Sequence, residues 1–146
     1  MSDNFDELAL WLERIAQQLN DGQKRTLNRR LSTKLRANLK RRIAAQTDPN
    51  GRRFTPRKRN QIGSIRSGAM FKRLPKMIKT AYSSSHAEVG FSGRTAEVMA
   101  VHQYGKTIKP SANARATRYA VRETVGWSEE DKQLIIDEIK DFLLNK

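Results

Sequence analysis

The sequence contains no cysteine, so disulfide bonds and cysteine-ligated metal ions are excluded. It has no stretch of roughly 20 consecutive apolar residues, the length that a membrane-spanning helix needs. The first ten residues are acidic and lack the basic and apolar regions of a signal peptide. These absences predict a protein of cytoplasmic origin that makes no contact with a membrane.

Residues suited to catalysis are also scarce. His86 and His102 fall in different predicted elements, and no HExxH or comparable metal-binding spacing occurs. The serines at 83–85 lack the glycine-flanked turn of a hydrolase nucleophile. No GxxxxGK[ST] loop and no GxGxxG motif is present to cradle a phosphate. The sequence therefore predicts a protein that is not an enzyme and that binds no cofactor or metal.

Acidic residues are nearly missing from the middle of the chain. The 146 residues carry a net charge of +14, with −3 on residues 1–20, +17 on 21–82, +3 on 83–127 and −3 on 128–146. One interpretation is a polyanionic partner, whose phosphates the lysines and arginines would neutralise. The other is self-association, in which the basic middle of one copy meets the acidic ends of the next. Composition alone leaves both open.

Apolar residues at steps of three and four predict two helices in the first third of the chain. The first covers 4–20 and is ended by Asn20-Asp21-Gly22. The second covers 23–46 and has a basic outer face; the two form an antiparallel pair or pack separately on a sheet. A proline and Asn50-Gly51 then predict a turn, which opens a basic arm at about 47–64 that reaches away from the core.

The rest of the chain alternates between short helices and strands. In order, we predict a short helix at 66–74, strands at 78–82 and 87–91 joined by serines 83–85, a helix at 95–104, a loop at 106–116, a strand at 118–122 and a C-terminal helix capped by Ser128 with Asp131 three residues on. Gly105 should hold positive φ after its helix, with Tyr104 packed and His102 hydrogen-bonded locally. This order predicts one α+β domain over 1–146 with a small antiparallel sheet.

Four segments carry a resemblance to a known family. They are QTDPNGRRFTPRK at 46–58, IRSGAMFKRL at 65–74, VGFSGRTAEVMAVHQYG at 89–105 and ARATRYAVRETVGWSEEDKQLI at 114–135. In this order they resemble the phage virion morphogenesis family of tail-completion proteins, and the resemblance covers essentially the whole chain. One departure is Thr124-Val125, where larger aliphatic residues are expected.

The resemblance implies a structural subunit without catalysis. Such a subunit completes the tail or neck and takes part in head–tail joining as a ring, with six-fold symmetry or a multiple of it. The implied partners are further copies of the chain, the tail tube, neck or head-completion proteins and phage DNA in the channel. The implied location is the head–tail junction of a virion assembled in the host cytoplasm. The alternative from the residues alone is a non-specific nucleic-acid-binding protein, and a regulator of a host protein is more remote.

A head-to-tail ring needs two different, complementary surfaces on each subunit. The basic candidates, for a subunit, a neck protein or DNA, are Arg25, Arg29, Arg30, Arg36, Arg41, Arg42, Arg52, Arg53, Arg57, Lys58 and Arg59. The acidic candidates are Asp6, Glu7, Glu13, Glu129, Glu130, Asp137 and Asp141. The predicted structural turns are at Gly51 and at His102, Tyr104 and Gly105.

Overall fold

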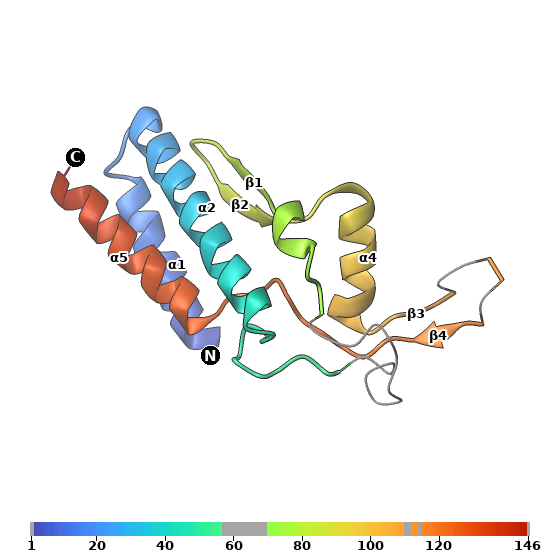
Figure 1. The fold of residues 1–146 in the computed structure, drawn as a ribbon. Helices are drawn as coiled ribbons and strands as arrows, with labels where there is room; N and C mark the ends of the chain where they lie inside the picture. Colours follow the sequence, from blue (N-terminus) through green and yellow to red (C-terminus); the bar gives the residue numbers. More distant parts are fainter. Residues whose placement is uncertain (1, 57–69, 110–111, 114, 146) are drawn as a thin grey trace.

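The computed structural model describes residues 2–56, 70–109, 112–113 and 115–145. The predicted α+β class is confirmed (Figure 1). The elements are α1 (Ser2–Ala16), α2 (Asp21–Ala44), the 3-10 helix η1 (Leu74–Met77), β1 (Lys79–Tyr82), β2 (Ala87–Gly90), α4 (Gly93–Tyr104), β3 (Thr107–Ile108), β4 (Thr117–Arg118) and α5 (Glu129–Asn145). No helix in these ranges is long and apolar enough to cross a membrane.

Helices α1, α2 and α5 lie side by side and form one layer (Figure 1). Helix α1 runs antiparallel to α2, which was one of the two arrangements expected. Each helix turns an apolar stripe inward because its apolar residues recur every three or four positions. The buried residues of this core are Leu8, Ile15, Leu19, Leu27, Leu31, Leu35, Ile135, Ile139 and Phe142.

The second half of α2 belongs to another apolar cluster. Leu39 and Ile43 of α2 pack there with Leu74, Ile78 and Met99. The hairpin β1–β2 lies along α2 beside this cluster, with Lys79 opposite Gly90 and Tyr82 opposite Ala87. Helix α2 therefore connects the three-helix layer to the smaller elements.

The junction between α1 and α2 differs from the prediction. The prediction that Asn20-Asp21-Gly22 ends the first helix is wrong, because α1 ends at Ala16 and Asn20 begins α2. The Gln23 N–H donates to the Asn20 side chain at 2.8 Å, and the Asn20 N–H donates to the Gln23 side chain at 3.0 Å. This capping box satisfies two backbone donors that the first turn of a helix leaves free.

Within the described ranges, the strands form two separate two-stranded sheets instead of one. In the second sheet Thr107 pairs with Arg118 and Ile108 with Thr117, so part of the loop expected at 106–116 is a strand. The predicted strand at 118–122 is shorter in the structure, because β4 ends at Arg118; beyond it, the Arg122 N–H donates to the carbonyl of His102 at 2.7 Å. The β3–β4 hairpin extends away from the helical layer (Figure 1).

The prediction of a projecting arm at 47–64 is wrong for residues 47–56. Thr47 and Arg53 form a β-bridge, and the Phe54 ring is buried against Phe71 at a centroid distance of 5.5 Å. Burying the Phe54 ring draws this stretch onto the domain. Residues 57–64 lie outside the described residues. So do residues 66–69 of the short helix predicted at 66–74; residues 70–73 form a turn that leads into η1.

Candidate interaction surfaces

Many of the basic side chains of α2 contact the protein itself. The Arg25 guanidinium lies 5.0 Å from the centre of the Tyr82 ring, and that of Arg30 lies 5.4 Å from the Phe142 ring. A cation over an aromatic face is attracted by the ring quadrupole. Lys34 forms an ion pair with Glu138, whose side chain is nearly buried. These contacts hold part of the basic face against neighbouring elements.

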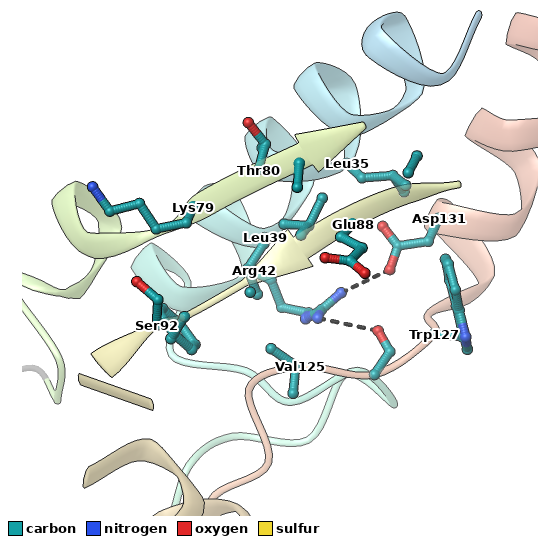
Figure 2. A pocket seen from close by; sticks show the side chains of 16 residues that line it. Leu35, Leu39, Arg42, Lys79, Thr80, Glu88, Ser92, Val125, Trp127 and Asp131 are labelled. Carbon is teal, nitrogen blue, oxygen red and sulfur yellow. Dashed lines mark hydrogen bonds and ion pairs between the residues drawn. The ribbon is translucent and has the colours of Figure 1, made fainter. Parts of the chain in front are cut away.

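Arg42 is enclosed by residues of α5 and of the segment that precedes α5. Its Nη1 donates to Oδ2 of Asp131 at 3.1 Å, and its Nη2 donates to the carbonyls of Thr124 at 2.6 Å and Gly126 at 3.3 Å. The side chains of Arg42 and Asp131 are 10% and 7% exposed. Figure 2 shows the guanidinium next to Asp131. Arg42 therefore ties α2 to α5 and the preceding segment, and its guanidinium, predicted to contact a neighbour or DNA, is bound within the chain.

Asp131 also forms the start of α5. Its N–H donates to Oγ of Ser128 at 3.0 Å, and its Oδ2 accepts from the Ser128 N–H at 3.2 Å. The Asn38 side chain of α2 donates to its other oxygen at 3.2 Å. The Asp131 carboxylate thus caps α5 and also accepts hydrogen bonds from the side chains of Asn38 and Arg42 on α2. The capping role was visible in the sequence, but the pairing with Arg42 was not.

A pocket of about 610 Å³ opens beside this ion pair, between the β1–β2 hairpin, α2 and residues 125–127 (Figure 2). The large apolar residues of its lining are Leu35, Leu39, Val89, Phe91, Val125 and Trp127. Trp127 stands at one side of it and is 57% exposed. The charged groups of the lining are Arg42, Lys79, Glu88 and Asp131. In the described part of the chain, no three His, Asp or Glu residues gather to hold a metal.

The turn after α4 is shaped by Gly105. This residue has φ 63° and ψ 47°, the left-handed conformation expected at this place, and its N–H donates to the carbonyl of Val101. A Cβ atom at this position would lie 2.8 Å from Cγ2 of Val121. The expectation that Tyr104 packs is wrong, because its side chain is 71% exposed. Gly51 also has positive φ, at 82°, in the turn before Arg52.

Near this turn, the Arg122 side chain connects its own segment to residues 55–56 and to His102 of α4. Its Nε donates to the carbonyl of Thr55 at 2.8 Å and its Nη2 to that of Pro56 at 3.2 Å. Nδ1 of His102 lies 3.3 Å from its Nη1, and the His102 ring meets the Phe71 ring edge-on at 5.0 Å. Arg122 is 6% exposed. Sequence reasoning missed it, because Arg122 follows Arg115 and Arg118 and directly precedes Glu123, so no local pattern sets it apart.

Comparison with known proteins agrees with the earlier resemblance. The sequence profile of the phage virion morphogenesis family matches residues 3–144. The chain belongs to this family. It is 25% identical over 127 residues to the tail completion protein S of Escherichia phage P2, an alignment that covers 83% of this chain and 85% of that protein. No solved structure matches the chain.

The other predicted residues of this virion morphogenesis protein lie in several places. Arg29, Arg41, Arg52 and Arg53 are exposed, although Arg41 contacts the side chain of Asn38. Arg36 is half-buried, and its Nε is enclosed without a hydrogen bond in the described structure. Arg57, Lys58 and Arg59 lie outside the described residues. All the predicted acidic residues are exposed, namely Asp6, Glu7, Glu13, Glu129, Glu130, Asp137 and Asp141.

The acids that pair with α2 were not among those predicted. Glu138 and Asp131 form the two ion pairs with Lys34 and Arg42 that the described residues contain between α5 and α2. Both carboxylates are buried at the helix contact, whereas the predicted acids point outward. Of these nine acidic residues, Glu138 and Asp131 stabilise the contact between α5 and α2, and the seven predicted ones remain on the surface.

Proposed function

We propose that this protein is a structural subunit that completes a phage tail and takes part in head–tail joining as a homo-oligomeric ring. The observation that carries the proposal is the family match over residues 3–144, together with a relative named tail completion protein S that the alignment covers to 85%. The protein has no catalytic role in this proposal. It is a single-domain component of the virion at the junction of tail and head.

The distribution of charge supports a protein partner over a general nucleic-acid partner. Arg25, Arg30, Lys34 and Arg42 contact aromatic rings, a carboxylate or carbonyls within the molecule. Non-specific DNA binding depends on cations that are free to displace counterions from phosphates. The high net charge therefore overstates the basic surface that is open to DNA.

Exposed apolar side chains also support assembly with other subunits. The large hydrophobic residues on the surface are Leu10, Met77, Val98, Tyr104, Ile108, Val121, Trp127 and Leu144. Apolar area of this kind provides most of the affinity at protein interfaces, while charges set their orientation. In a ring the subunits cover part of this area, and the tail tube and the neck or head-completion proteins cover the axial faces.

The proposal is tested with the purified protein and with the phage that carries its gene. We expect light scattering after size-exclusion chromatography to give a defined oligomer, and negative-stain images to show rings. Deleting the gene should leave filled heads unjoined to tails. A monomer that retards DNA in a salt-sensitive way, with normal joining in the deletion mutant, would instead identify a nucleic-acid-binding protein.

A further inference from the structure

The β3–β4 hairpin is a projecting basic element. Its described residues Lys106, Lys109, Arg115 and Arg118 are all exposed, and the sequence has no acid between Gly105 and Arg122. The hairpin leaves the body of the protein at the end of α4 and extends away from the helices (Figure 1). We call these four residues the hairpin bases. Among the described residues, no carboxylate forms an ion pair with any of them.

Apolar side chains stand beside the hairpin bases. Ile108 is 37% exposed, Val121 61% and Tyr104 71%. Val121 lies against Gly105, and Nζ of Lys106 lies 6.0 Å from the centre of the Tyr104 ring. Contacts to DNA phosphates come from cations and hydrogen-bond donors, whereas exposed aliphatic groups are covered at protein interfaces. The mixture favours a protein with an acidic, partly apolar surface as the partner.

One face of α1 has these properties. Leu10 is 59% exposed, and Asp6, Glu7 and Glu13 lie three or four positions from it, which places them around it on the helix surface. These three carboxylates are exposed and form no hydrogen bond or ion pair in the described structure. We call Asp6, Glu7, Leu10 and Glu13 the Leu10 face.

Two exposed acidic residues of α5 are less available to a partner than those of the Leu10 face. Asp137 accepts a hydrogen bond from Gln133 at 2.8 Å, and Asp141 accepts one from Asn145 at 3.1 Å. A base that binds either carboxylate has to compete with these donors of the same helix. The carboxylates of the Leu10 face have no such competitor.

We propose that the hairpin bases of one copy dock on the Leu10 face of a second copy. In Figure 1 the β3–β4 hairpin and α1 lie at opposite ends of the protein, so one copy cannot join its own two surfaces. A contact between unlike surfaces is heterologous, and its repetition closes a ring or continues as a filament. This inference rests on the proposed ring and names the two surfaces that form it.

A charge-reversal series tests the docking by sedimentation velocity at several concentrations. We expect Lys106→Glu with Arg118→Glu to weaken self-association by about tenfold or more, because like charges then face each other. Lys72→Glu with Arg73→Glu makes the same charge change at two exposed residues outside both surfaces and should leave association unchanged. Adding Asp6→Lys and Glu13→Lys to the reversed hairpin should restore assembly. Circular dichroism establishes that each variant is folded.

The other outcomes contradict the inference in distinguishable ways. A wild-type chain that stays monomeric overturns the ring and this docking together. A wild-type ring that the hairpin reversal leaves intact overturns the docking alone; if DNA retention is then lost, the hairpin binds DNA. Restoration by Asp137→Lys with Asp141→Lys, in place of the α1 changes, moves the contact to α5 and overturns the assignment to the Leu10 face.

Discussion

Replacing Arg42 with methionine should destabilise the fold strongly while keeping the apolar volume of the side chain. The change leaves the Asp131 carboxylate, 7% exposed, without its cation, and it removes the donor from the carbonyls of Thr124 and Gly126. Breaking a buried ion pair by removing one partner costs about 3–5 kcal/mol. Asp131 keeps its bonds from Ser128 and Asn38, which favours the lower end, about 3 kcal/mol.

Urea unfolding followed by circular dichroism measures this loss. With a slope of about 2 kcal/mol per molar urea, the midpoint should fall by about 1.5 M. Arg29→Met is the matched control, because Arg29 is an exposed arginine of the same helix whose side chain has no partner in the described structure. Its effect should stay within about 0.5 kcal/mol. Equal midpoints for the two variants would refute the view that Arg42 fastens α2 to α5.

Three further substitutions test the two glycine turns and the cap of α5. Gly105→Val should lower the free energy of unfolding by about 2–4 kcal/mol, because it adds a close contact to the strain of positive φ. Gly51→Ala imposes the same backbone strain, but its Cβ would meet no atom within 4 Å, so it should lower the free energy of unfolding by about 1 kcal/mol. If thermal unfolding showed equal losses of stability for the two variants, the close contact between residue 105 and Val121 would be relieved without cost. Ser128→Ala removes the acceptor for the Asp131 N–H and should cost about 1 kcal/mol, and an unchanged melting temperature would mean that the cap is dispensable.

Features set by neighbouring residues were predictable from the sequence. The start of α5 follows from Ser128 and Asp131, three positions apart, and the hairpin of β1 and β2 follows from alternation on either side of the serines. The start of α2 was equally local, because Asn20 and Gln23 have capping-box spacing. The prediction failed there because Asn-Asp-Gly also suits a helix end, and the two signals compete at one place.

Features set by distant residues were not predictable in this way. Arg42 and Asp131 are 89 positions apart, and Arg122 lies 67 positions from the carbonyl of Thr55 that it binds. Charge counting assigns every arginine the same role, because burial depends on where the chain returns in space. The segment after α2 illustrates the error: its bases suggested an arm, but Phe54 and the carbonyls before residue 57 hold its first part against the domain.

The same contacts explain how a chain of net charge +14 can be stable and still present the charged surfaces of the proposed docking. The acids at the contact between α5 and α2 are neutralised within the fold by Lys34 and Arg42. The Leu10 face and the hairpin bases lie too far apart to neutralise each other, because exposed charges are screened beyond about 8 Å at physiological salt. In the proposed docking their attraction acts between copies, at close range, so assembly should weaken as salt is raised while the free energy of unfolding changes little. Salt that lowered stability and association equally would show that these charges act within one chain.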